Sequence, residues 1–485
     1  MTKRIFCIFV AIVSFHIANA QLIIQNGNFE LKDTTKTSFK NWNGGDEGYS
    51  ITREKNSINN GVYVLKMQKT GKGEHAAFSQ TINYKTSGHL EKYIFSAYIK
   101  TKNVNSGMAR LWFQSFDESG NKLTAFDYKK SELHGNTEWK KVSTEAFVPS
   151  MTTKIILGGL MVGDGAAWFD NFELEKIETG KLQQSEVAKK YLDEALEIIT
   201  TNSIRRDSVD FKKLRAIAYS IAEDAKTTAD CYVAIKCVLH NLGDHHSLLV
   251  TEEEEKSYKT YDESKVDMPV AKLIDNKIGY ITVPPFASVS EKMEKQFGDS
   301  MQHLIKAMDG QNIIGWIVDV RNNTGGNCGP MLAGIGPIMG EGVANYYVDA
   351  NGKKDSMGYN NGNVFQNDTI VQKIDSPYTL IHPNPYVAVL TNGLCGSSGE
   401  TVVLSFKNRP KTKSFGAPTY GLSTGNSDFK LSDGAVILLT SGIGCDRLGN
   451  VYGGKIQPDV FVDDNEKTKN DEVVDTAVKW LEGNK

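Results

Sequence analysis

The sequence predicts a multidomain protein in which an all-β jelly-roll sandwich precedes a helical bundle and an α/β core. Three observations predict this order. Residues 21–176 form short runs of alternating apolar and polar residues between Gly, Asn and Asp turns. Residues 177–250 place apolar residues at a helical period, and residues 251–485 alternate strand-like and helix-like segments. At 485 residues the chain is long enough for several domains.

Residues 1–20 have the pattern of a secretory signal peptide. Lys3 and Arg4 precede an apolar stretch, and Ala18-Asn19-Ala20 forms a small-x-small cleavage motif. No later stretch has the roughly 18 apolar residues that a membrane span needs. We therefore expect an exported protein, periplasmic or secreted, that is soluble and has no transmembrane segment in its mature chain.

Charge and cysteine content narrow the class of partner and the redox chemistry. A net charge of −3 argues against nucleic acid as the partner, since phosphate binding requires a basic surface. Cleavage of the signal would leave five cysteines, an odd and sparse set that does not form a disulfide framework. A single bridge between Cys328 and Cys395 is conceivable, but buried free thiols are the favoured expectation.

The sandwich opens with "NGNFEL" (26–31) and closes with "AAWFDNFELEKI" (166–177). It resembles the galactose-binding-like jelly rolls, which include carbohydrate-binding modules of secreted enzymes. This resemblance implies a structural calcium held by Glu30 and Asp170 and a glycan as partner. The alternative is that both carboxylates are solvated residues at a sheet edge. Trp42, Tyr49 and Trp112 could stack on a sugar ring, although such aromatic residues more often belong to the core.

The helical segment has recognisable ends. Asp207 and Asp210 are candidate N-caps for its second helix, and Gly243 is a natural stop for its third. The charged stretch from Thr251 to Lys265 has no apolar period, so we expect a solvated loop there. A hairpin turning at Asp275-Asn276 should then open the α/β core.

Four stretches could carry chemistry. They are "LGDHHSLL" (242–249), "VDVRNNTGGNCG" (318–329), "NGLCGSSGE" (392–400) and "CDRLGNVYGGKIQPD" (445–459). Together they suit acyl transfer, in which a serine hydroxyl attacks once a neighbouring histidine takes its proton. A Gly-rich loop and a helix N-terminus can both supply N–H donors for the developing oxyanion.

These motifs resemble the S41 family of serine peptidases, the C-terminal processing and tricorn-like group. "DVRNNTGG" (319–326) is similar to the D-x-R-x-N-x-G-G loop of the family, and "GSSGE" (396–400) to its S-x-x-E nucleophile turn. "FGAPTYG" (415–421) and "KIQPD" (455–459) follow in the family's order. The resemblance implies a ClpP/crotonase-like core that hydrolyses protein or peptide substrates and needs no cofactor for catalysis.

The resemblance also assigns roles to residues. Counting back from Glu400 makes Ser397 the nucleophile, with the N–H of Ser398 and that of Gly325 or Gly326 as oxyanion donors. The base is His246, because it occupies the histidine of the tricorn-like L-x-D-x-H-[ST] motif. The processing-peptidase branch uses a lysine instead, and Leu422 stands in the place of that lysine.

The residue that would orient the histidine is left open. The acidic position of the tricorn-like group aligns near Gly453, which carries no carboxylate. Asp446, Asp459 and Asp244 are the alternatives. The missing acid favours a rival interpretation, a non-catalytic S41-like protein that binds a ligand or glycan. The intact Ser397, His246 and Gly-rich loop favour the peptidase. A glycan hydrolase is the weakest alternative, because no pair of carboxylates stands out in the core.

Overall fold

The computed structural model describes residues 22–32, 39–45, 48–56, 61–84, 86–123, 128–178, 182–259, 263–310, 312–463 and 470–484. The predicted signal peptide, residues 1–20, lies outside these ranges. In the part of the chain so described, no helix is both long and apolar enough to cross a membrane. The chain divides into two compact units, the first of residues 1–188 and 216–237 and the second of residues 189–215 and 238–485.

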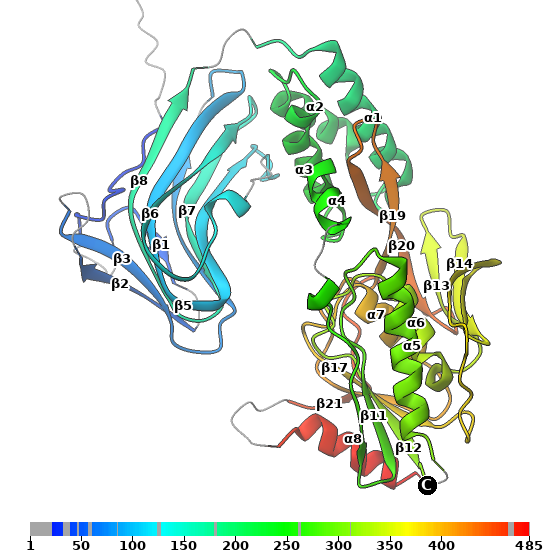
Figure 1. Ribbon diagram of the computed structural model, residues 1–485. Coiled ribbons are helices and arrows are strands. Elements are labelled where there is room, and N and C mark those ends of the chain that lie inside the picture. The colour runs from blue at the N-terminus through cyan, green and yellow to red at the C-terminus, as the bar shows by residue number, and fades with distance from the viewer. Residues whose placement is uncertain are drawn as a thin grey trace, which may run out of the picture. The chain divides into compact units, whose positions relative to one another are not determined.

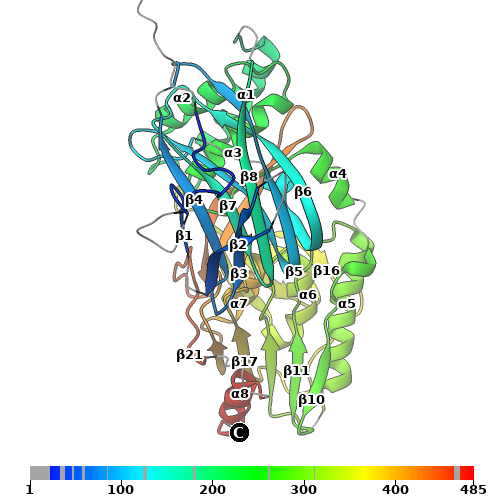
Figure 2. The ribbon, with the colours of Figure 1, turned by 90° about the vertical axis from the view of Figure 1, so that its left-hand side faces the viewer.

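The first unit contains the predicted sandwich (Figures 1 and 2). Its strands pair in the order β1-β4-β7-β5-β8-β3-β2, and β6 pairs with β5. The long strand β5 joins two layers, because its first half pairs with β6 and β8 and its second half with β7. The strands are β1 (Asn43–Gly44), β2 (Tyr49–Lys55), β3 (Tyr63–Lys69), β4 (His75–Asn83), β5 (Glu91–Phe116), β6 (Leu133–Val148), β7 (Lys154–Val162) and β8 (Ala166–Ile177).

The helical segment contributes to both units. It contains α1 (Glu186–Asn202), α2 (Phe211–Ile221) and α3 (Tyr232–Asn241). Of the two candidate caps for α2, Asp210 is the one that acts, since its carboxylate accepts the N–H of Lys213 at 3.0 Å. The segment from 177 to 250, predicted as one subdomain of the core, is divided between the units after Ala188, Arg215 and Cys237.

The expectation of a loop from Thr251 to Lys265 was wrong for most of its length, because α4 spans Glu252–Lys259. Thr251 and Glu254 cap each other: the Glu254 N–H donates to Thr251 Oγ1 at 3.2 Å and the Thr251 N–H donates to Glu254 Oε2 at 3.0 Å. Four glutamates in the first turn also suit the positive end of the helix dipole. Capping and charge placement therefore form a helix where the apolar period is absent.

The second unit is built on a six-stranded sheet in the order β10-β11-β12-β17-β18-β21. Only the β10–β11 pair is antiparallel, and its turn has positive φ at Asp275 (50°) and Asn276 (54°), which confirms the predicted hairpin. The strands are β10 (Ala271–Ile274), β11 (Ile278–Thr282), β12 (Gly315–Asp319), β17 (Tyr386–Thr391), β18 (Thr412–Gly416) and β21 (Val460–Phe461).

Helices cover both faces of this sheet, as Figure 1 shows. One face packs on α5 (Glu291–Met308), α6 (Cys328–Met339) and α7 (Ser398–Phe406) through a core that includes Trp316, Val318 and Phe406. The other face packs on α8 (Glu472–Glu482) through Ile317 and Leu390. Neighbouring residues of one strand thus face opposite cores, as parallel strands covered on both sides require.

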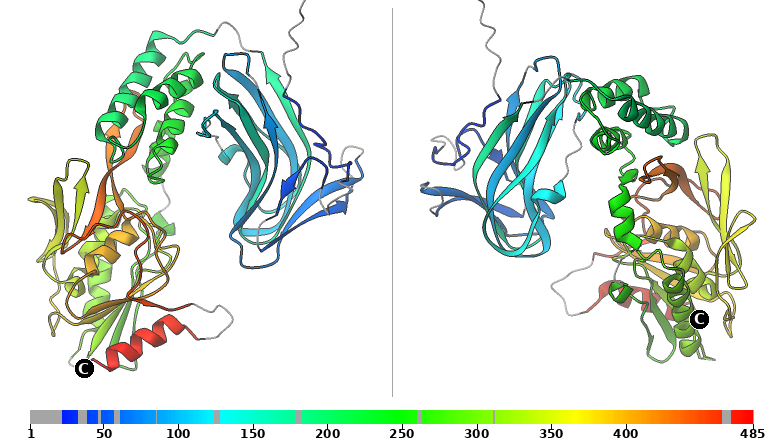
Figure 3. Two further views of the ribbon diagram at one scale, coloured as in Figure 1. Left: turned by 180° about the vertical axis from the view of Figure 1, so that it is seen from behind. Right: turned by 45° about the horizontal axis from the view of Figure 1, so that its top comes forward.

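A second, seven-stranded sheet runs in the order β16-β15-β14-β13-β20-β19, with β9 paired to β20. Figure 3 shows the β19–β20 hairpin extending alongside α1. The N–H of Ile204 donates to Thr440 C=O at 2.9 Å, which ties the hairpin to the helical segment. The strands are β9 (Leu248–Val250), β13 (Gly342–Asp349), β14 (Lys354–Asn360), β15 (Asn363–Gln366), β16 (Thr369–Lys373), β19 (Thr424–Lys430) and β20 (Val436–Asp446). Together the two units confirm the predicted fold class.

Candidate active site

Three loops meet at one edge of the six-stranded sheet. Strands β12, β17 and β18 are parallel neighbours, so their carboxyl ends lie at the same edge. The loops that leave these ends are residues 320–327, 392–397 and 417–423. Together with the ends of the adjoining strands and helix, they form the D-x-R-x-N-x-G-G, S-x-x-E and G-x-P-T-x-G motifs, which are far apart in the sequence. The topology therefore gathers the predicted chemistry at this edge.

Ser397 stands at the sharp turn between β17 and α7. Its backbone has φ 51° and ψ −119°, a strained conformation for a residue with a side chain. Its N–H donates to Glu400 Oε2 at 3.1 Å, which holds the turn in place. Gly325 packs directly against it, because a Cβ on Gly325 would lie 2.8 Å from Ser397 Cβ. Strained strand-to-helix turns of this type present the nucleophile in many hydrolases.

The structure brings the predicted serine and histidine together. His246 Nε2 lies 2.9 Å from Ser397 Oγ, although the two residues are 151 positions apart in the chain. This distance lies within the range in which a general base can take a proton. His245, the other histidine of the motif, is exposed and has φ 57°. Only His246 is therefore placed to act on Ser397.

The main chain of His246 is held from both sides. Its N–H donates to Asp244 Oδ1 at 3.0 Å, and its C=O accepts the side-chain amide of Asn426 at 3.0 Å. Ser247, the next residue, donates to Asp244 Oδ2 and accepts the N–H of Thr440. Asp244 thus fixes the turn that carries the ring through hydrogen bonds to the His246 N–H and to Ser247.

The ring is oriented by a hydroxyl. His246 Nδ1 lies 2.7 Å from Thr424 Oγ1 on β19. If the Ser397 hydroxyl donates to Nε2, then Nδ1 carries the proton and donates to Thr424 Oγ1. The sequence does not single out Thr424, since a threonine in a strand is ordinary and belongs to none of the four motifs.

The other two candidate acids lie in different networks. The Asp446 carboxylate accepts the Asn408 amide at 2.6 Å and the Tyr452 hydroxyl at 3.1 Å. Asp459 accepts the Lys407 ammonium at 2.8 Å. Both carboxylates hold loops beside α7. The expectation that one of the three acids orients the histidine ring was therefore wrong, because Thr424 occupies that position.

Burial governs the titration of His246. Removal from water lowers the pKa of the imidazole below its ordinary value of 6.5, and the negative charge of Asp244 opposes this effect. The hydroxyl of Thr424 adds no charge that would stabilise the imidazolium. His246 is consequently neutral, and able to accept a proton, at neutral pH.

The donors for an oxyanion also take part in packing. The bridge between Phe286 and the loop uses the C=O of Gly325 and the N–H of Asn327, so the N–H of Gly326 points to the opposite side. There the Ser398 hydroxyl donates to Gly326 C=O, which places Gly326 against the start of α7. As the first residue of α7, Ser398 has an N–H with no acceptor inside the helix.

Gly325 cannot serve as the second donor in this arrangement. Its N–H donates to Asn323 Oδ1 at 2.9 Å, inside a fully buried contact. The Asn323 amide in turn donates to Val283 C=O at 2.9 Å. Of the two glycines that the sequence left open, Gly326 therefore remains the candidate donor, and Gly325 shapes the loop.

The fully buried Glu400 carboxylate joins the turn of Ser397 to the third loop. Besides the Ser397 N–H, it accepts the Leu422 N–H at 2.6 Å, the Gly421 N–H at 3.1 Å and the Thr419 hydroxyl. Burial raises the pKa of this carboxyl, and these hydrogen bonds oppose the rise. Leu422, in the place of the family's lysine, contributes only its backbone here.

The predicted calcium ligands of the sandwich are close enough to interact. Asp170 is fully buried, and its Oδ2 has no hydrogen-bond partner. Burial raises the pKa of Asp170 to about 7, opposed by the Asn171 N–H and reinforced by the Glu30 carboxylate. Glu30 Oε1 accepts the N–H groups of Val62 and Tyr63. In the described ranges, no cluster of three or more His, Cys, Asp or Glu is placed to hold a metal ion.

An unpaired buried carboxylate oxygen beside a second carboxylate fits a hard cation, provided that further oxygen ligands come from backbone carbonyls or water. Glu30 and Asp170 are therefore compatible with calcium, although two carboxylates alone do not complete its coordination.

The three aromatic residues that could stack on a sugar ring differ in their burial. Trp42 and Tyr49 belong to its core, with 3% and 7% of their surface exposed. Trp112 faces outward between the buried Leu111 and Phe113, and it pairs across the sheet with Gly158. A partly exposed indole beside a residue without a side chain is a flat apolar surface.

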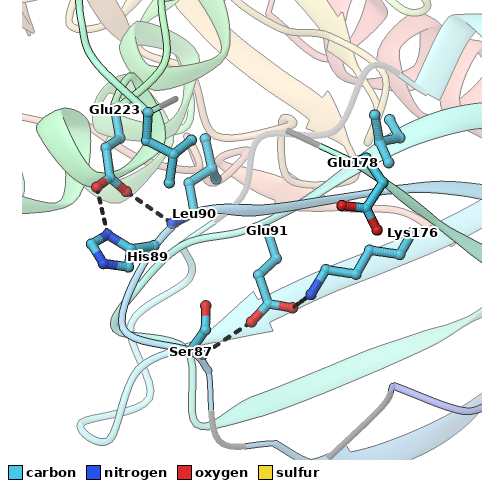
Figure 4. Close-up of a pocket in the computed structure, with 9 residues that line it drawn as sticks. Ser87, His89, Leu90, Glu91, Lys176, Glu178 and Glu223 are labelled. Atoms are coloured by element: carbon cyan, nitrogen blue, oxygen red, sulfur yellow. Dashed lines mark hydrogen bonds and ion pairs between the residues drawn. The ribbon is translucent and has the colours of Figure 1, made fainter. Parts of the chain in front are cut away.

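A cavity of about 490 Å³ lies in the first unit (Figure 4). Two pairs of its titratable side chains contact each other, Glu91 with Lys176 and His89 with Glu223. Glu91 accepts the Ser87 N–H and the Lys176 ammonium, each at 3.0 Å, and Glu223 contacts the His89 ring at 2.9 Å. These pairs stabilise the lining.

The five cysteines of the predicted mature chain are free, so no bridge joins Cys328 to Cys395.

Comparison with known proteins agrees with the motifs. Residues 277–462 match the family model described as Peptidase family S41. The chain is 26% identical over 296 residues to the nisin-resistance protein of Lactococcus lactis subsp. lactis, covering 60% of this chain and 86% of that protein. It is 24% identical over 198 residues to the chloroplastic carboxyl-terminal-processing peptidase 2 of Arabidopsis thaliana, covering 41% of this chain and 34% of that one.

A solved structure of a lipoprotein from Streptococcus agalactiae superposes with a TM-score of 0.52 at 23% identity. The match covers 64% of this chain and 100% of the lipoprotein. This likeness shows a shared fold.

The role of Glu400 can be tested by Glu400→Gln. An amide has one acceptor oxygen, and its NH2 group would face N–H donors, so several buried donors would lose their acceptor. We expect the free energy of unfolding to fall by about 2–4 kcal/mol, measured by chemical denaturation. Labelling of Ser397 by a fluorophosphonate probe should slow by about a hundredfold. The exposed Glu341→Gln is the control, and equal behaviour of the two variants would contradict this role.

Proposed function

We propose that the protein is an exported serine endopeptidase of the S41 type that acts through Ser397 and His246, since residues 277–462 match the model of that family. The observation that carries the proposal is the 2.9 Å contact between Ser397 Oγ and His246 Nε2. Protein or peptide is the substrate class that the family implies. The signal-peptide pattern of residues 1–20 supports export.

The proposed reaction uses groups of the chain alone. His246 Nε2 takes the proton of Ser397 as Oγ attacks the peptide carbonyl, and the N–H groups of Gly326 and Ser398 stabilise the oxyanion. The imidazolium then gives its proton to the leaving amine, which leaves an acyl group on Ser397. A water molecule, deprotonated by His246, hydrolyses this ester and restores the enzyme.

Thr424 acts in this proposal as a positioning residue. By accepting from Nδ1 it keeps the lone pair of Nε2 directed at Ser397. A carboxylate in that position would also stabilise the imidazolium, and its loss in a Ser-His-Asp triad costs about four orders of magnitude. A hydroxyl supplies orientation without that charge, so the dyad works with a weaker base.

The alternative is a non-catalytic protein that binds a ligand or glycan. The absence of a carboxylate on the His246 ring favours it, and the strained turn at Ser397 together with the 2.9 Å dyad favours the enzyme. Strain of this kind persists where a reactive geometry requires it.

The function is tested by exposing the purified protein to a fluorophosphonate probe and to unfolded β-casein. We expect labelling at Ser397 and cleavage of casein, both abolished by Ser397→Ala and by His246→Ala. The exposed neighbour variant His245→Ala should retain both. If the unaltered protein is neither labelled nor active, the non-catalytic alternative holds.

The lowered pKa of His246 predicts the pH dependence of activity. The base works only when neutral, so kcat/KM should fall as pH drops through a pKa below 6.5. Thr424→Asp would place a negative charge at Nδ1 and should move this limb upward by about one unit. Thr424→Val should lower kcat about tenfold to a hundredfold, whereas Thr424→Ser should not. Identical pH profiles for all variants would show that Thr424 has no role in positioning the ring.

For the sandwich we propose a structural calcium held by Glu30 and Asp170, and a glycan stacked on Trp112. The unpaired Oδ2 of Asp170 supports the first, and the flat surface of Trp112 beside Gly158 supports the second. Aromatic faces are apolar surfaces suited to the faces of sugar rings.

The calcium and glycan proposals can be tested with Asp170→Asn and Trp112→Ala, each of which serves as the control for the other. Calcium in excess should stabilise the protein by about 2–3 kcal/mol in thermal unfolding. Asp170→Asn should remove this gain. Trp112→Ala should keep the gain but lose retardation in gels that contain a soluble galactan. Stability that ignores calcium, or migration that ignores galactan, would contradict the corresponding proposal.

A further inference from the structure

Strand β16 is an open edge of the seven-stranded sheet in the described structure. It pairs with β15, and nothing follows it in the strand order. Two of its apolar side chains are exposed, Ile370 by 59% and Val371 by 46%. Edge strands of soluble proteins usually avoid exposed apolar residues, because an open edge pairs readily with another extended chain. The open edge of β16 is therefore a candidate site for pairing with another extended chain.

The backbone groups of the edge can be assigned. The N–H of Ile374 donates to Gly362 C=O at 2.8 Å, so this residue faces β15. In an antiparallel pair successive residues alternate in direction, and the N–H and C=O of Lys373 must point away from β15. A bulge opposite Val364 and Phe365 interrupts the same pairing next to Val371. The open edge thus offers main-chain hydrogen bonds beside apolar side chains.

The strand also passes close to the candidate active site. A Cβ on Gly329 would lie 3.4 Å from Gln372 Cβ, so β16 touches the first turn of α6. Gly329 follows Gly326, the proposed oxyanion donor, by only three residues, and Asn327 caps the helix between them. Strand β16 therefore lies beside the helix whose preceding loop carries Gly326.

We propose that the peptide substrate binds in extended form as an additional strand on the open edge of β16, with apolar side chains against Ile370 and Val371. This rests on the proposed peptidase function and deepens it. Main-chain hydrogen bonds would provide affinity for any extended chain, and the apolar side chains would provide preference. The substrate class is accordingly an unfolded, apolar segment of polypeptide.

The test measures binding separately from catalysis. A fluorescein-labelled apolar peptide from β-casein is titrated into Ser397→Ala protein, and its anisotropy is followed. Ile370→Asp places a charge on the apolar surface, and Lys373→Pro removes an edge N–H. Each should weaken binding about tenfold. Lys373→Ala and the distant exposed Val270→Asp are the controls and should bind as the parent does.

In the active protein the same edge variants should raise KM for the peptide and leave hydrolysis of p-nitrophenyl acetate unchanged, since this ester is too small to reach β16. Unchanged peptide affinity in Ile370→Asp and Lys373→Pro would overturn the inference. So would a dimer in sedimentation experiments that these variants dissociate, because the edge would then pair with a second copy. Absence of ester hydrolysis in the unaltered protein would instead count against the peptidase function, and the binding result would stand independently.

Discussion

The geometry of the candidate site depends on one buried carboxylate. Glu400 lies in the first turn of α7 and accepts hydrogen bonds from Ser397 behind it and from Thr419, Gly421 and Leu422 in a separate loop. A fully buried carboxylate is tolerated only when its acceptor positions are filled. The hydrogen bond from the Ser397 N–H holds the strained turn of Ser397. The hydrogen bonds from Gly421 and Leu422 hold the loop that leads into β19.

From this anchor the geometry extends to the base. The loop that Glu400 binds leads directly into β19, which carries Thr424 and Asn426. These two residues contact the His246 ring and its main chain. Ser397 and His246 are 151 positions apart in the sequence. Glu400 nevertheless holds the turn of Ser397 and also the loop that leads into β19, the strand that contacts His246. A displacement of the loop would therefore move the ring and the hydroxyl in a correlated way.

The neutral partner of His246 gives the dyad a distinct electrostatic character. Burial disfavours the imidazolium, and the negative charge of Asp244, which also accepts the His246 N–H, opposes this effect. Such a base is available at lower pH than one paired with a carboxylate, but it has less driving force to accept a proton. In the proposed reaction the oxyanion donors would then carry a larger share of the stabilisation, which is why the contact between Gly326 and Ser398 matters to the proposal.

The sequence by itself determined what depends on local pattern. Alternation and helical period predicted the sandwich and the α/β core, and the resemblance of the motifs to family S41 selected Ser397 over Ser398 and His246 over His245. The helix at Glu252–Lys259 escaped this reasoning, because its stability comes from capping and charge placement. Only the tertiary structure decided which glycine N–H is free and which side chain meets Nδ1. The Asn323 side chain accepts the Gly325 N–H, and the Thr424 hydroxyl contacts His246 Nδ1 although the two residues are 178 positions apart. Contacts of this kind leave no periodic trace in a sequence, because they depend on how three loops converge at one sheet edge.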